Sequence, residues 1–219
     1  MRFILIALIA VVIGFSFEAC KSSSGPKLFC DTACIKDTMK FSNDAHPLKP
    51  YLYISARNCV ADTLIWSYAG MGTNRKSGFA DLLNNPDIRL NKNFVKCFIG
   101  DTTYAWLMFN DCVTGRGYIL KLPYNKTNPI GRKSSAINNT DPKYSVASGL
   151  AAYTDRGNIF VEEMATGKKA MMTFGKMVDI DYDAIHNYID SVNVSPGRIW
   201  VKIKIDNDWT TLEKEITLQ

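Results

Sequence analysis

The sequence predicts a mainly β protein built from antiparallel hairpins that follow one another in a meander. β-branched and aromatic residues gather in short runs, and Gly, Asn and Asp separate these runs. Only one segment, at about residues 181–192, has the apolar spacing of a helix. The strands expected in chain order are 51–54, 63–68, 94–99, 104–109, 118–122, 149–153, 158–163, 168–174, 198–205 and 209–218.

Two of these strands indicate how the sheets are covered. Both alternating faces of 104–109 are apolar, which is typical of a central strand buried on both sides. In 198–205 isoleucine and valine alternate with Lys202 and Lys204, as expected for a strand with one face in the core and one in water. Turn residues such as Asp155-Arg156-Gly157 and Asp206-Asn207-Asp208 join successive strands into hairpins.

The remaining segments are expected to be helical or irregular. A short helix up to Met39 precedes the first strand, and one helical turn is expected at 79–83. In 181–192, Ile185, Tyr188, Ile189 and Val192 recur at helical spacing, with acidic residues in the first turn. Residues 70–93 and 123–143 are polar, and the prolines and asparagines of the second segment predict a long loop.

A shift of 52 positions superposes two hairpins, residues 107–119 and 159–171. Asp111 then falls on Glu163, and Thr114-Gly115-Arg116 falls on Thr166-Gly167-Lys168. This arrangement resembles the outer hairpin of β-propeller blades, whose repeats are about 40–50 residues long. The resemblance implies about four blades. A β-sandwich accounts for the same strands, so both architectures are retained.

The N-terminus has the organisation of an export signal. Arg2 precedes an apolar run at 3–17, which is shorter than the roughly 20 residues of a membrane-spanning helix. The junction Phe17-Glu18-Ala19-Cys20 resembles the lipobox of bacterial lipoproteins. The resemblance implies cleavage after residue 19, a fatty-acyl anchor such as palmitate on Cys20, a flexible tether at 20–27 and one β domain at 28–219.

Anchoring at Cys20 implies an exported protein of the bacterial cell envelope, attached to a membrane, with the outer membrane and the periplasm as its expected location and the leaflet left open. Asp-Thr pairs such as Asp62-Thr63 resemble the glycosylation acceptor of exported Bacteroidota proteins. Its formal net charge is +5, and no run of lysine or arginine is longer than two. Nucleic-acid binding is not expected, because it usually requires a clustered basic stripe. In an exported chain the other cysteines are expected to form disulfides among Cys30, Cys34, Cys59, Cys97 and Cys112.

No cofactor or metal site is predicted. Asp179, Asp181 and Asp183 have the spacing that opens a calcium loop, but position six is Ala184 instead of the glycine that the loop requires. We therefore interpret Asp181 and Asp183 as residues that cap the helix expected at 181–192. Asp183 and Asp190 lie at helical spacing from His186, an acid–base pair that catalysis can use.

We expect a non-catalytic binding or assembly role toward another envelope protein or glycan. The two polar segments supply the candidate binding residues Arg75, Lys76, Arg132, Lys133 and Tyr124, whose cations attract acidic groups. One alternative is a secreted glycan- or peptide-active hydrolase that uses acids such as Asp183 with His186. Another is a carbohydrate-binding module, which requires Trp66 or Trp106 to be exposed.

Overall fold

The computed structural model describes residue 30 and residues 35–84, 88–174 and 181–219, without the side chains of 182–184. The signal at 1–19, the tether at 20–27 and Cys20 lie outside these residues. In the described part the strands form four sheets that are antiparallel except for one pair, which confirms the mainly β prediction. Among the described residues no helix is both long and apolar enough to cross a membrane.

The first two sheets are four-stranded meanders in which each strand pairs with the next. Sheet I comprises β1 (Met39–Ser42), β2 (Tyr51–Arg57), β3 (Val60–Ser67) and β4 (Arg75–Gly78). The short helix α2 (Phe79–Leu83) follows, then a 3-10 turn (Lys92–Phe94). Sheet II comprises β5 (Val95–Ile99), β6 (Tyr104–Asn110), β7 (Gly117–Pro123) and β8 (Gly131–Lys133).

The last two sheets are interleaved in the sequence, because one strand of sheet IV precedes sheet III. Sheet III is the meander of β10 (Leu150–Asp155), β11 (Asn158–Glu163) and β12 (Lys169–Thr173). Sheet IV contains β13 (Ile189–Ser195), β14 (Arg198–Ile205) and β15 (Asp208–Glu215). Its fourth strand, β9 (Tyr144–Val146), precedes sheet III in the sequence and pairs with β13 in parallel.

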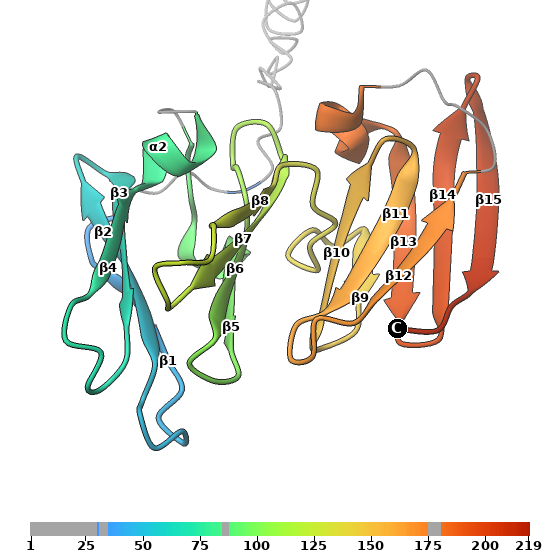
Figure 1. Ribbon diagram of the computed structural model, residues 1–219. Coiled ribbons are helices and arrows are strands. Elements are labelled where there is room, and N and C mark those ends of the chain that lie inside the picture. Colours follow the sequence, from blue (N-terminus) through green and yellow to red (C-terminus); the bar gives the residue numbers. More distant parts are fainter. Residues whose placement is uncertain (1–29, 31–34, 85–87, 175–180) are drawn as a thin grey trace, which may run out of the picture.

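The sheets stand side by side in chain order (Figure 1). Apolar side chains fill the spaces between them. Leu52 and Leu107 belong to the core between sheets I and II. Trp106 and Tyr153 belong to a smaller cluster between sheets II and III. The core between sheets III and IV includes Val161 together with other aliphatic residues of both sheets. β6 is an inner strand that is buried on both faces, as predicted.

The two hairpins related by the 52-residue shift have the same turn geometry. In the β6–β7 turn the Thr114 hydroxyl donates to the Asp111 carboxylate (2.6 Å). The glycine after Thr114 donates its N–H to the Asp111 carbonyl oxygen (2.8 Å). In the β11–β12 turn the Thr166 hydroxyl donates to the Glu163 carboxylate, and the N–H of Gly167 donates to the Glu163 carbonyl oxygen. The glycines of the two turns both have positive φ (77° and 75°). Glycine adopts this conformation at the lowest cost, which explains the repeated Thr-Gly.

The helix predicted at 181–192 is wrong in its second half. A 3-10 helix covers Tyr182–Asn187, and the chain then continues as β13. A β-bulge between Ile189 and Ser191 shifts the alternation by one residue, so Ile189 and Val192 are both buried at a spacing of three. A bulged strand therefore imitated the spacing of a helix.

Four other strands, β1, β4, β8 and β9, lie where none was predicted. The long loop at 123–143 includes β8, and Ala136 pairs with Tyr153 in an isolated antiparallel bridge. Residues 35–38 are not helical, and Met39 begins β1 in place of ending a helix. All four are short edge strands, whose conformation depends on pairing with a neighbouring strand.

Candidate functional site

A groove lies between sheets II and III, and both sheets contribute side chains to it. Its inner part has a volume of about 220 Å³ and its outer part about 380 Å³. Phe98 and Met164 line both parts, so the two parts adjoin. The groove has the size range of small-molecule and peptide-side-chain sites.

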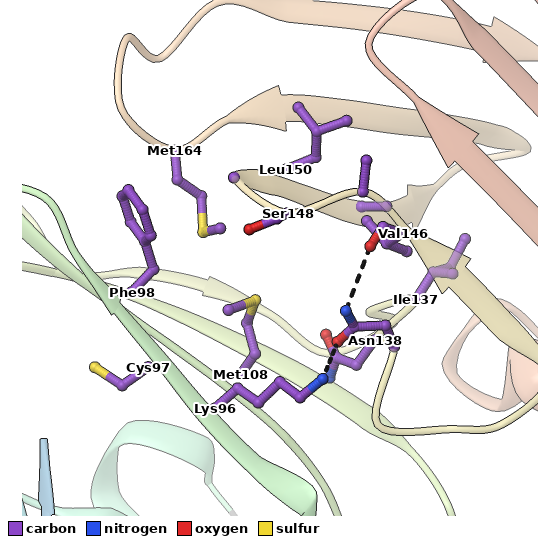
Figure 2. Close-up of a pocket in the computed structure, with 14 residues that line it drawn as sticks. Lys96, Cys97, Phe98, Met108, Ile137, Asn138, Val146, Ser148, Leu150 and Met164 are labelled. Carbon is purple, nitrogen blue, oxygen red and sulfur yellow. Dashed lines mark hydrogen bonds between the residues drawn. The ribbon is translucent and has the colours of Figure 1, made fainter.

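The walls of the inner part are largely apolar. Figure 2 shows Phe98 and Met108 of sheet II and Met164 and Leu150 of sheet III around one space. Alternation along β5 turns Phe98 toward sheet III, while its neighbour Cys97 packs toward sheet I. Methionine adapts its unbranched thioether to differently shaped partners, so this lining suits an apolar ligand group.

Polar bonds close the groove near β9. The Lys96 ammonium donates to the Asn139 side-chain oxygen (2.9 Å), and the Asn139 amide donates to the Val146 carbonyl oxygen (3.3 Å). Both bonds are drawn in Figure 2. They connect β5 of sheet II with β9 of sheet IV. The Lys96 side chain is therefore positioned at the edge of the groove, where it can meet an acceptor on a ligand.

An ion pair joins the two sheets at the outer part of the groove. The Lys121 ammonium is 2.7 Å from a carboxylate oxygen of Glu162 and about equally close to the ring centres of Tyr104 (4.5 Å) and Trp106 (4.6 Å). Glu162 is buried, and its other oxygen lies 3.4 Å from Lys169. This network is structural, because the charge of Lys121 is already balanced within the protein.

The cysteines divide into bonded and free residues. Cys30 and Cys112 form a disulfide with Cα atoms 4.9 Å apart, and Cys59 is also disulfide-bonded. Cys34 lies outside the described residues. Cys97 is free, and burial raises the pKa of its thiol to about 12. Its sulfur points away from the groove in Figure 2, so it is not a nucleophile for that site.

Of the predicted binding residues, Arg75 and Tyr124 have structural roles. The Arg75 guanidinium lies over the Trp66 ring (5.3 Å) and donates to the Pro123 carbonyl oxygen (3.0 Å). Tyr124 is 1% exposed and packs edge-on against Tyr68. These two residues connect sheets I and II, with Tyr124 buried and the Arg75 guanidinium engaged by contacts within the protein. Lys76 is exposed on the edge strand β4.

Arg132 and Lys133 lie together on β8, and the structure places Arg156 with them. All three line a cavity of about 280 Å³ beside the β10–β11 turn. Arg156 lies far from the other two in the sequence, and the bridge between Ala136 and Tyr153 brings the segments together.

The predicted acid–base pair receives no support from the described side chains. Burial, and next the charge of Lys143, lower the pKa of His186 and keep it neutral. Asp190 is exposed and bound by Lys202 (3.3 Å) and Ser191 (3.1 Å). The Asp183 side chain is outside the described set.

The calcium candidate rests on the same region of the chain. Asp179 lies outside the described residues, and Asp181 is exposed. The described residues contain no group of three His, Cys, Asp or Glu side chains that can hold a metal ion.

The aromatic residues proposed for sugar stacking are in the core. Trp66 is 1% exposed and Trp106 is 3% exposed, so neither offers a ring face to a carbohydrate. The sequence analysis missed the groove, because its residues come from segments that lie far apart in the chain. The signal available in the sequence was the alternation along 96–98, which places Lys96 and Phe98 on one face of the strand and Cys97 on the other.

Comparisons with protein-family models, with curated proteins and with solved structures found no match.

Proposed function

We propose that the protein is a lipid-anchored component of the cell envelope, held through Cys20, with a non-catalytic binding or assembly role. We assign the binding site to the groove between sheets II and III. The observation that carries this assignment is the lining of Phe98, Met108, Leu150 and Met164, an apolar surface reached from solvent.

The composition of the groove favours binding over catalysis. The charged residues of its described lining are Lys96, Lys121 and Asp101, and no histidine accompanies them. General-base catalysis needs a base within hydrogen-bond reach of the group it activates. An apolar cavity with a few polar groups at its edge is typical of a site that holds an apolar side chain of a partner. The expected occupant is an apolar segment of another envelope protein.

The groove can be tested by filling it. Ser148 is exposed and lines the inner part, whereas Ser145 is exposed on β9 and does not line it. We expect Ser148→Trp to reduce recovery of specific envelope proteins in a pull-down from detergent-solubilised envelopes, with Ser145→Trp behaving as wild type. Equal recovery with both variants would remove the groove from the proposal.

The anchor is tested separately with Cys20→Ala. This variant is expected to leave the membrane fraction and to retain fewer envelope partners than wild type. A variant that stays with the membrane contradicts anchoring at Cys20. If neither form retains a partner and the soluble variant hydrolyses envelope glycans or peptides, the enzyme alternative replaces the binding role.

A further inference from the structure

A second, basic cavity lies between β8 and the β10–β11 turn. Arg132, Lys133 and Arg156 line its 280 Å³ together with the hydroxyl residues Ser134, Ser135 and Thr154. Asp155 is the one carboxylate in this lining, so cations outnumber anions by three to one. A pocket with this excess of positive charge suits a phosphate group.

Two of the three cations, Arg132 and Lys133, are each held by a contact that leaves the positive charge without a counter-ion. One guanidinium nitrogen of Arg132 donates to the Leu82 carbonyl oxygen (3.0 Å), which fixes the group and leaves further N–H donors. The Lys133 ammonium lies 4.3 Å from the ring centre of Tyr153. Burial, with smaller contributions from Glu162 and Asp155, raises the pKa of Tyr153 to about 12, so the ring carries no charge.

The same end of the molecule carries the disulfide nearest to the proposed anchor. The carbonyl oxygen of Ser134, in the cavity lining, accepts a bond from Arg116 (2.6 Å). Arg116 belongs to the β6–β7 turn, which also contains Cys112. Cys112 is bonded to Cys30. The basic cavity and the point where the N-terminal segment is covalently attached therefore adjoin.

The disulfide limits how far this end can move from a membrane. Cys20 and Cys30 are ten positions apart, and ten extended residues reach at most about 36 Å. If the disulfide were absent, the chain would first be held at Met39, where β1 begins. Met39 is nineteen positions from Cys20, and an extended segment of this length reaches about 68 Å. The bond therefore keeps the β6–β7 end close to the lipid surface.

We propose that the cavity of Arg132, Lys133 and Arg156 binds the phosphate headgroup of an anionic lipid in the membrane that carries the anchor. This inference rests on the anchor of the proposed function. Headgroup binding adds a second, electrostatic attachment and turns the opposite end of the sheets away from the membrane. The outer part of the groove lies at that opposite end, because the β5–β6 and β11–β12 turns line it.

The test uses mature Cys20→Ala protein, so that binding depends on the cavity alone and needs no anchor or partner. Flotation with vesicles of phosphatidylcholine mixed with phosphatidylglycerol is compared with vesicles of phosphatidylcholine. The variant Arg132→Gln/Lys133→Gln/Arg156→Gln is expected to bind the anionic vesicles about 10- to 100-fold more weakly. A control that changes Lys49, Lys126 and Lys168 to Gln removes the same charge from exposed loops at the other end and is expected to bind as wild type.

Circular dichroism checks that the triple variant is folded. If it is not, Arg156→Glu serves in its place, because Arg156 is an exposed turn residue. Equal loss of binding in the cavity and control variants overturns the proposal, and so does equal binding of wild type to both kinds of vesicle. Saturable binding of inorganic phosphate without vesicle binding would assign the cavity to a free anion and reject the lipid headgroup. Failure in the envelope pull-down leaves this assay unaffected.

Discussion

At the scale of single residues, Glu162 is the buried charge on which the contact between sheets II and III depends. It lies between two lysines, and one of them, Lys121, is itself enclosed by two aromatic rings. Removing the carboxylate leaves the ammonium of Lys121 partly buried without its counter-ion, which costs more than a surface ion pair contributes.

We predict that Glu162→Ala lowers the free energy of unfolding by about 2–4 kcal/mol. Denaturant titration measures the change. The double variant Glu162→Met/Lys121→Met should recover part of the loss, since no charge then remains unpaired. Glu213→Gln removes an exposed ion pair with Arg198 and serves as the control, with no change in midpoint expected. A Glu162→Ala protein as stable as this control contradicts the role assigned to the network.

His186 gives the protein a predicted dependence on pH. Its folded-state pKa is below the usual 6.5, because burial and then the Lys143 cation disfavour the charged ring. The unfolded chain therefore binds a proton at a higher pH than the folded protein does, and protonation favours unfolding. Stability should fall as the pH drops from 6.5 toward the folded-state pKa.

Urea unfolding at a series of pH values measures this effect against His186→Gln. The variant has no ring to protonate, so the difference in stability between wild type and variant should change across this range. A constant difference contradicts the prediction. An NMR titration of the His186 ring gives the folded-state pKa independently.

At the scale of elements, the repeated Thr-Gly turn allows the same bond to be tested in two environments. Asp111 is buried and also accepts from the backbone N–H of Arg89 (3.0 Å), so its carboxylate depends on every donor it has. The corresponding bond between Thr166 and Glu163 is exposed to water, which can replace it.

We expect Thr114→Val to cost about 1–2 kcal/mol of unfolding free energy and Thr166→Val less than about 0.5 kcal/mol. Thermal or urea unfolding of the two variants gives the comparison. Equal costs would mean that the hydroxyl contributes in the same way in both turns, whatever its burial.

The elements that sequence reasoning predicted well are those that local chemistry determines. Turns such as Asp206-Asn207 form because both residues have positive φ (51° and 72°), a conformation that Asp and Asn tolerate. The errors concern elements that depend on distant partners. β13 was mistaken for a helix because its bulge is fixed by pairing with β14, and β8 was missed because three residues form a strand only beside β7.

At the scale of the whole molecule, the Cys30–Cys112 disulfide closes a large loop around sheet I. The two cysteines are 82 residues apart, and constraining such a loop in the unfolded chain is worth about 4 kcal/mol. We predict that Cys30→Ala/Cys112→Ala lowers the free energy of unfolding by a similar amount. Denaturant unfolding of the double variant is preferable to reduction, because Cys59 is disulfide-bonded as well. Unchanged stability contradicts the loop-closure account.

The candidate sites were only partly accessible from the sequence. Arg132 and Lys133 were selected from their charge, and the structure adds Arg156 to them. Arg75 and Tyr124 had the same attractive chemistry but pack within the protein, which their sequence context did not reveal. The groove forms where two sheets meet and its residues have no motif, so the alternation along β5 was the one signal of it in the sequence.

The placement of β9 has a consequence for synthesis of the chain. β9 leaves the ribosome before all of sheet III, yet the strand it pairs with, β13, emerges only after β12 is complete. During translation the edge of β9 stays without its partner while β10–β12 form a hairpin array of their own. The C-terminal half therefore completes its folding only after β13 has emerged, and a protein shortened at the end of sheet III would carry an unpaired strand edge prone to association with other chains.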